Sequence, residues 1–434
     1  MDQGGGGELA RLGLRPRVLL LHGPTSYRAP AFVAAAERLG LEVVRGLDLP
    51  NALAEEWGVE AALDFANPEA TVETIAALHA ADPFAAVLAV DDAATLLAAR
   101  AANRLGFPAN DSGAALAARD KWVMRERFTA AGVPVPAYRR FPLEAAPEEV
   151  AREVAASPGF PCVVKPLRLS GSRGVIRADD AATFAAAWSR TRRIVEAEAP
   201  PPEAAYLLVE EYLPGVEVAV EGLLTGGDLR TLAIFDKPDP LDGPFFEETI
   251  YVTPSRLPTG TQVAISARTA EAAAAVGLRE GPVHAELRIN DEGIWPIELA
   301  GRSIGGLCSS VLEFGLGTTL EALILRHAVG WDLPPPSEQA GEAAGVMMIP
   351  IPRAGLLRGW SGEDAARAVP GVTGLEITAK PNQPLAALPE ASSYLGFLFA
   401  RGATPAAAEA SLRQAHAALS FRIERTIELV PVAG

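Results

Sequence analysis

The segment from residue 281 to residue 302 constrains both the fold and the chemistry of this chain more than any other. Apolar and polar residues alternate through VHAELRI (283–289), which is the period of a strand with one buried and one polar face. A second run, IWPIELA (294–300), follows Asp291–Gly293, a segment with turn chemistry. If these three residues form the loop, Glu286 lies opposite Glu298, with Cβ atoms about 5 Å apart.

Two carboxylates at this spacing destabilise a sheet unless something neutralises them. A divalent cation would do so, because Mg²⁺ prefers carboxylate oxygens and substrate phosphates as ligands. The alternative is a solvated hairpin face, on which both charges lean apart into water. Since paired surface charges are common, the rest of the sequence must distinguish the two.

Length and charge bound the class of protein. The chain has 434 residues, enough for about three domains, and 49% of them are hydrophobic, enough for substantial cores. Its formal net charge of −16 argues against a nucleic-acid partner, whose binding surface is basic. An anionic substrate must therefore be held by local basic residues.

The two cysteines, Cys162 and Cys308, form neither a disulfide framework nor a zinc-type spacing, which predicts a reducing, cytoplasmic location. No run of about 18 apolar residues exists, so we expect no membrane span. Residues 1–13 lack a signal pattern and are predicted to be a flexible terminus.

The order of predicted elements indicates an α/β part followed by α+β parts. RVLLLHG (17–23), LEVVRG (41–46) and FAAVLAVDD (84–92) alternate with helical patterns, which predicts a Rossmann-like domain within residues 1–115. It lacks the GxGxxG fingerprint, so no nicotinamide or flavin cofactor is expected. We predict a central α+β domain at 116–330. After a proline-rich connector (331–345), a C-terminal α+β module occupies the rest of 331–434 and includes a helix over 406–427.

A glycine-rich loop follows a buried strand and is a candidate phosphate cover. Lys165 ends the strand PCVVKP, and the loop LRLSGSRGV comes directly after it. Backbone N–H groups of such a loop can approach phosphate oxygens closely, although glycine-serine loops are more often simple turns. The candidate residues are Ser170, Gly171, Ser172, Arg173 and Gly174. The spacing of a Walker loop is missing.

Two further segments could contact a nucleotide. Lys121 precedes the helix KWVMRERF, where it could reach a phosphate or be a solvated helix lysine. The segment VEEYLPGVEV can present backbone groups to an adenine and a carboxylate to a ribose, or be an ordinary exposed edge. Its candidate residues are Glu210, Glu211, Leu213 and Glu217.

In this order, the motifs resemble the ATP-grasp superfamily: DK before a helix ending AGVPVP, then VVKP, SGSRGV, VEEYLPGVEV and the acidic hairpin ending IELAGR. The resemblance covers about half of the chain, and FDKPDPLDGPFFEETIYVTP with the C-terminal module is most similar to the L-amino-acid ligase branch. The resemblance implies that Lys121 and Lys165 contact ATP phosphates and that Ser170–Gly174 close over them. Glu210 and Leu213 would bracket the adenine, and Glu217 would accept from the ribose.

The same resemblance implies that Glu286 and Glu298 hold Mg²⁺, with Mn²⁺ as a substitute. The asparagine that the family usually has two residues later is Ala300 here, which leaves open whether one ion or two bind. Arg302 would be the catalytic arginine that stabilises the transferring phosphoryl group, or it would form a salt bridge to Glu286 or Glu298.

Several residues near this strand are weaker candidates for substrate contacts. Lys237 could add a phosphate contact, and Glu248 could bind a substrate ammonium group. His284 could orient a substrate or make a structural hydrogen bond. Gly305 and Gly306 form a turn against which a substrate carboxylate could rest.

The resemblance implies an ADP-forming carboxylate-amine ligase for small molecules, which joins an amino acid or related carboxylate to an amine through an acyl phosphate, in a chain that could be a homodimer. Two alternatives remain at this stage. One is a carboxylation similar to that of biotin carboxylases, and the other is an ATP-binding regulator without catalysis. The sequence does not specify the carboxylate or the amine.

Overall fold

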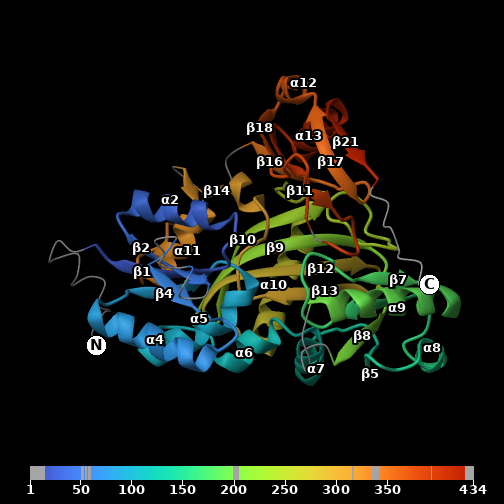
Figure 1. The fold of residues 1–434 in the computed structure, drawn as a ribbon, viewed down its shortest axis with the longest axis horizontal. Coiled ribbons are helices and arrows are strands. Elements are labelled where there is room, and N and C mark those ends of the chain that lie inside the picture. Colours follow the sequence, from blue (N-terminus) through green and yellow to red (C-terminus); the bar gives the residue numbers. More distant parts are fainter. Residues whose placement is uncertain are drawn as a thin grey trace, which may run out of the picture.

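A four-stranded parallel sheet forms the N-terminal part of the computed structural model (Figure 1). The structure describes residues 15–49, 53, 56, 60–198, 205–314, 317–334, 342–391 and 393–425. The predicted flexible terminus, 1–13, and residues 335–341 of the predicted connector lie outside these ranges. The strand order is β3-β2-β1-β4, and every pairing is parallel. The elements of this part are β1 (Arg17–His22), α2 (Ala29–Leu39), β2 (Glu42–Asp48), β3 (Ala61–Leu63), α4 (Pro68–Ala81), β4 (Ala86–Ala89), α5 (Asp92–Leu105) and α6 (Ser112–Ala117).

A small antiparallel sheet follows α7 (Lys121–Ala131). Its order is β5-β8-β6-β7, and α8 (Pro147–Ala156) and α9 (Ala181–Glu198) pack against it around the buried aromatic residues Phe184 and Trp188. Its strands are β5 (Tyr138–Pro142), β6 (Cys162–Pro166), β7 (Ile176–Ala178) and β8 (Tyr206–Glu211). Apolar residues at 207 and 209 lie on the face toward this core, as the period of a strand requires.

The largest sheet has eight antiparallel strands, in the order β13-β12-β9-β10-β11-β16-β20-β18. Its strands are β9 (Val216–Thr225), β10 (Asp228–Lys237), β11 (Ile250–Thr253), β12 (Gly281–Asn290), β13 (Gly293–Ala300), β16 (Ala343–Ile349), β18 (Val372–Ile377) and β20 (Gly396–Gly402). The helices α10 (Thr259–Val276), α11 (Leu320–Ala328) and α13 (Pro405–Ala418) pack against it. The strands β16, β18 and β20 lie after residue 330 and continue this sheet, so the sheet spans the predicted domain boundary at residue 330. The division of the chain into domains at residues 115 and 330 therefore stays a proposal.

Smaller elements complete the described chain. A 3₁₀ helix and a two-stranded sheet precede α11, and a short helix with a three-stranded sheet, in the order β19-β17-β21, accompanies β18 and β20. These elements are Cys308–Val311, β14 (Glu313–Phe314), β15 (Thr318–Thr319), β17 (Gly355–Ser361), α12 (Glu363–Arg367), β19 (Pro384–Leu385) and β21 (Ser420–Glu424). Among the described helices, none combines the length and the apolar composition needed to cross a bilayer.

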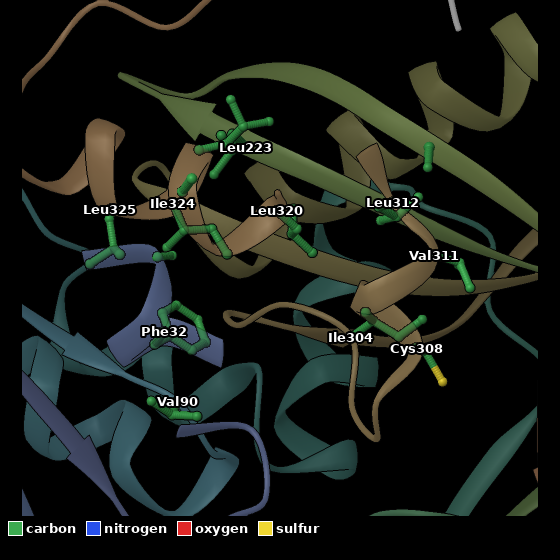
Figure 2. Close-up of a cluster of buried hydrophobic side chains, with 14 of the residues drawn as sticks. Phe32, Val90, Leu223, Ile304, Cys308, Val311, Leu312, Leu320, Ile324 and Leu325 are labelled. Atoms are coloured by element: carbon green, nitrogen blue, oxygen red, sulfur yellow. The ribbon is translucent and has the colours of Figure 1, made fainter. Parts of the chain in front are cut away.

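One continuous core fixes the N-terminal sheet against the eight-stranded sheet. Figure 2 shows Phe32 and Val90 from the N-terminal part beside Ile324 of α11, with Leu223 of β9 on the other side of that helix. Ile304 and Cys308 belong to the same cluster. Full burial of one such side chain contributes about 1.5–3 kcal/mol. The segment after β13 is therefore held between the two sheets.

Two predicted boundaries at the C-terminal end are wrong. The helix predicted over 406–427 ends at Ala418, and Ser420–Glu424 instead form β21, which pairs with β17. Leu419 is extended, and Ile423 is buried in the C-terminal core, so the period changes from helix to strand at this point. The connector predicted over 331–345 is shorter, because β16 already begins at Ala343.

We predict that Gly215, at the entry to β9, is required by close packing. Its φ is +126°, and an added Cβ would collide with the carbonyl oxygen of Ile289 on β12. Gly226, directly after β9, has a φ of +62° but no atom within 4 Å of such a Cβ. We expect Gly226→Ala to lower the free energy of unfolding by about 1–2 kcal/mol, from backbone strain alone. Gly215→Ala should lose about 1–3 kcal/mol more, from the collision. Urea titrations measure the free energy of unfolding of both variants. Equal losses of this free energy in Gly215→Ala and Gly226→Ala would contradict the packing argument.

Candidate active site

A cleft that is open to solvent lies between the small sheet and the β12–β13 end of the large sheet. Strands β6 and β8 contribute one wall, and β12 and β13 contribute the other. Of the residues singled out in the sequence, nine line it: Lys121, Lys165, Ser172, Glu210, Glu211, Leu213, Glu217, Glu286 and Glu298. They come from segments up to 177 residues apart, as the contact of Lys121 with Glu298 shows.

A β-bulge aims Glu298 into this cleft. The hairpin turn contains only Asp291 and Glu292, because Asn290 already pairs with Gly293, so the predicted three-residue loop is wrong. The shorter turn shifts the register by one residue, which would point Glu298 to the opposite face of the sheet. The register changes again between Glu286 and Leu287, where β13 carries one extra residue. Glu286 therefore faces Glu298, as predicted.

Two lysines line this cleft, one from β6 of the small sheet and one from the start of α7. Lys165 Nζ lies 2.6 Å from Glu210, and the same carboxylate accepts a hydrogen bond of 2.6 Å from Arg125 Nε. Lys121 Nζ donates to the carbonyl of Leu169 at 2.9 Å and lies 3.3 Å from Glu298. Burial lowers the pKa of Lys165, although Glu210 opposes that shift. The predicted phosphate-binding lysines thus line the same cleft, and each is paired with a different glutamate.

A second group of charges lies deeper along β9, β10 and β12. Lys237 Nζ contacts Glu217 at 2.8 Å, Glu248 at 2.5 Å and Glu286 at 3.4 Å, and its side chain is only 3% exposed. Arg288 Nε donates to Glu217 at 2.9 Å. The structure therefore places Lys237 among carboxylates and not on the wall of the cleft. Its predicted phosphate contact stays a proposal.

The carboxylates of this group could share a cation. Oxygen atoms of Glu217, Glu248 and Glu286 lie within 4.8 Å of one another. Burial and the charge of Glu286 raise the pKa of Glu248 to about 7. Burial also raises the pKa of Glu286, but Lys237 and His284 outweigh this effect and hold the pKa well below its usual range. Glu286 is therefore ionised at neutral pH, which a hard-metal ligand must be.

His284 makes the structural hydrogen bonds that the sequence left as an alternative. Its Nδ1 is paired with the buried carboxylate of Glu221, and its Nε2 lies 3.5 Å from Glu286. Glu221 and Glu286 raise the pKa of His284 to about 9, against the effect of burial. In the β12–β13 register, His284 faces Ala300, the position at which the family usually has asparagine.

Arg302 is held by the N-terminal part of the chain. Its Nε lies 2.7 Å from Asp92, the first residue of α5, and its Nη1 donates to the carbonyl of Ser303 at 2.8 Å. The predicted alternative, a salt bridge to Glu286 or Glu298, is wrong. Asp92 raises the pKa of Arg302 against the effect of burial, so the guanidinium is always charged.

The glycine loop and the glycine turn have backbone conformations that glycine favours. In Ser170–Gly174, Gly171 and Gly174 have φ of +63° and +71°. Only Ser172 of this loop lines the cleft, while Arg173 pairs with Glu198 at 2.5 Å. Gly306 has φ +62° and packs beside Phe397, and Gly305 precedes it in the segment between β13 and the 3₁₀ helix.

Asp92, Arg125, Glu221 and Arg288 are charged residues that contact this site and were not predicted. Each is a partner that fixes a predicted residue, as the contacts above show. Asp92 had a visible signal in the sequence, because it is the second residue of the acidic pair that ends FAAVLAVDD. The others lie within helix or strand patterns and carried no signal of their own.

Comparisons with known proteins agree with this geometry. Residues 158–311 match the family described as "ATP-grasp domain", residues 33–109 match "ATP-grasp N-terminal domain", and residues 347–424 match "L-amino acid ligase C-terminal domain 2". A D-alanine–D-alanine ligase from Gloeobacter violaceus is 32% identical over 237 residues, which cover 51% of this chain and 72% of that protein.

This chain is also similar to an alanine–anticapsin ligase and to an L-amino acid ligase of known structure. An alanine–anticapsin ligase from Bacillus subtilis is 28% identical over 229 residues, or 48% of this chain; the chain thus spans about half of that relative, 46%. The crystal structure of an L-amino acid ligase from Bacillus licheniformis superposes with a TM-score of 0.74 at 23% identity, covering 95% of this chain and 99% of that chain.

The chain belongs to the ATP-grasp superfamily. Its C-terminal segment places it with the members that are similar to L-amino acid ligases.

We predict a pH-dependent contribution of Glu210 to stability. Arg125 and Lys165 lower its pKa from 4.5 to about 2, against the effect of burial. A lowered carboxyl pKa stabilises the fold above pH 4.5, by about 3 kcal/mol here, and this contribution is lost as the pH falls toward 2. The stability deficit of Glu210→Gln relative to the native protein should therefore shrink by about 2 kcal/mol between pH 6 and pH 3.

Urea unfolding at each pH measures this difference, with Glu211→Gln, at the exposed neighbouring residue, as the control. A deficit for Glu210→Gln that stays constant with pH would show that the carboxylate is not stabilised in the folded protein.

Proposed function

We propose that this protein is an ATP-dependent, ADP-forming ligase that joins a small-molecule carboxylate to an amine. The observation that carries the proposal is the meeting of two lysines and two opposed glutamates in one cleft of an ATP-grasp fold, with Arg302 near enough to interact electrostatically with Glu298. The match to ligases of the same superfamily supports it.

The cleft offers each part of ATP a matching group. Lys121 and Lys165 bind phosphates, and the loop Ser170–Gly174 closes over them. The backbone between Glu210 and Leu213, at the end of β8, borders the adenine, and Glu217 accepts from the ribose hydroxyls. Glu217 is already bound by Lys237 and Arg288, so its carboxylate is fixed in place before a ribose arrives.

The donor set fits a hard divalent cation such as Mg²⁺. Glu286 and Glu298 supply carboxylate oxygens on the wall of the cleft, with Glu217 and Glu248 close to Glu286. When bound, the ion neutralises charge on the phosphates. The residue at position 300 is alanine, so the described strands offer these glutamates and no amide ligand there.

The proposed reaction has two steps. A carboxylate oxygen of the first substrate attacks the γ-phosphorus of ATP, the bond to ADP breaks, and an acyl phosphate forms. The amine then attacks the acyl carbon, inorganic phosphate leaves, and the amine nitrogen gives up a proton. Arg302 stabilises the negative charge that develops in both steps, because Asp92 fixes its guanidinium and no reorganisation is needed. Glu248 would bind a substrate ammonium group.

A screen of carboxylate and amine pairs with ATP and Mg²⁺ tests the proposal. Phosphate and ADP should be released together for at least one pair, and mass spectrometry should find the condensed product. ADP formation that depends on bicarbonate alone would favour carboxylation. Tight ATP binding without turnover across a broad panel would favour a regulator. Light scattering of the purified protein would test the predicted homodimer.

We predict that Glu286→Gln lowers phosphate release by about 100-fold or more, because an amide cannot replace an ionised ligand. Electron paramagnetic resonance should show weaker binding of Mn²⁺ in the presence of ADP. The control is Glu292→Gln, at the exposed turn of the same hairpin, which should leave both unchanged. Native Mn²⁺ affinity in Glu286→Gln would contradict the metal site.

A further inference from the structure

The last residue of the glycine loop, Gly174, is bound by the C-terminal part of the chain. Its N–H donates to the carbonyl of Pro389 at 2.9 Å. Pro389 is buried and lies in the turn that follows β19. The carbonyl of Gly174 accepts a hydrogen bond of 2.8 Å from Thr191 Oγ1, on α9. Both backbone polar groups of Gly174 are therefore occupied, and one of them is bound by a segment 215 residues later in the sequence.

An ion pair beside this hydrogen bond joins the same two parts of the chain. Arg190, the residue before Thr191, donates from Nε and Nη2 to the two carboxylate oxygens of Glu390, at 2.6 and 2.9 Å. Two parallel hydrogen bonds of this kind fix the relative orientation of the partners as well as their distance. The bonds from Arg190 also lower the pKa of Glu390, so the carboxylate is ionised at neutral pH.

A third segment, the connection between β10 and β11, meets the same arginine. Phe245 forms a β-bridge with Ile176, two residues after Gly174. The guanidinium of Arg190 lies 4.9 Å from the centre of the Phe245 ring. The next residue, Phe246, lines the cleft that contains the two lysines. Arg190 therefore contacts both a segment that borders the cleft and the C-terminal part of the chain.

The other end of the glycine loop is held by the start of α7. Lys121 donates from its backbone N–H to the carbonyl of Leu167 at 3.0 Å and from Nζ to that of Leu169 at 2.9 Å. Between the two ends, Ser172 has a φ of +56°, a conformation that is unfavourable for a residue with a side chain. Such a conformation persists only where the surrounding structure holds it. Leu169, Ser172 and Val175 line the cleft, so contacts at both ends of the loop determine the shape of its wall.

We propose that Glu390, through Arg190, is a positioning residue for the glycine loop and so for the binding of the nucleotide phosphates. The C-terminal part of the chain would thus contribute to nucleotide affinity without touching the nucleotide. This inference rests on the nucleotide site of the proposed function. A partly exposed ion pair contributes little to global stability, so its loss should be felt in the loop and not in the unfolding of the whole chain.

Charge reversal tests the ion pair through equilibrium binding of ATP and of adenosine, measured by calorimetry. Glu390→Arg and Arg190→Glu should each weaken ATP binding by about 3–10-fold. Adenosine lacks the phosphates that the loop would cover, so its affinity should not change. The double variant, with Arg190→Glu and Glu390→Arg together, should recover most of the ATP affinity.

The matched control is Glu424→Arg. Glu424 pairs with Arg358 at 2.7 Å, between β21 and β17, and both side chains are exposed to a similar extent as those of Arg190 and Glu390. This pair makes no contact with the glycine loop, so Glu424→Arg should leave the affinities of ATP and adenosine unchanged.

Hydrogen exchange gives a second readout, because the amide of Gly174 is itself the donor to Pro389. In the protein without nucleotide, a peptide that covers residues 170–176 should exchange faster in Glu390→Arg than in the native protein. The double variant should restore the native exchange rate, and Glu424→Arg should not alter it.

Native ATP affinity in both single variants would overturn the inference, and so would equal losses of affinity for ATP and adenosine. Losses that add in the double variant would also overturn it, because they would show that the two side chains act independently. The binding assay requires no turnover. Absence of phosphate release in the substrate screen would therefore refute the ligase function alone, whereas native protein that binds no ATP would overturn both proposals.

Discussion

One buried guanidinium, that of Arg125, holds the two walls of the cleft together. From α7 it donates to Glu210 on β8, which in turn holds Lys165, and its Nη2 donates to the carbonyl of Ile297 at 2.8 Å. Ile297 is the residue of β13 that the bulge leaves unpaired, so the same guanidinium supports the bulge that aims Glu298. Removal of one partner from a buried charge pair costs about 3–5 kcal/mol. The positions of one proposed phosphate-binding lysine and one proposed metal-binding glutamate thus depend on a residue that would touch neither ligand.

The protein supplies its own cations to the opposed glutamates. The sequence argument was that Glu286 and Glu298 require a neutralising partner, and a metal ion was one candidate. The structure places Lys237 and His284 beside Glu286 and Lys121 beside Glu298. Repulsion between the two carboxylates is therefore no evidence for a metal. What favours Mg²⁺ is the ionised state of Glu286, the oxygen donors around it and the fold in which they occur.

Sequence reasoning found the residues that end strands or occupy loops and missed those that connect elements. Lys165 and Glu298 could be predicted because each follows a local pattern. The Glu286–Glu298 pairing was predicted from a three-residue loop, whereas the structure reaches it through a two-residue turn and a β-bulge. The partners Arg125 and Glu210 are 85 residues apart, and Arg302 and Asp92 follow strands of different sheets. Such contacts depend on strand order, which periodicity does not specify. The C-terminal helix was extended too far because alanine-rich helical propensity masked the short alternation of β21.

The contacts of Arg302 explain why the N-terminal sheet is part of the site. Asp92 holds Arg302 from the start of α5, and Arg28 holds Ser303 from the start of α2. The segment that follows Ser303 is packed, through Ile304 and Cys308, into the core that joins both sheets (Figure 2). A buried core resists continuous deformation, so a shift of the N-terminal sheet relative to β13 would move Arg302 as well. The starts of α2 and α5, which follow β1 and β4, therefore set the position of the charge on which the proposed phosphoryl transfer depends.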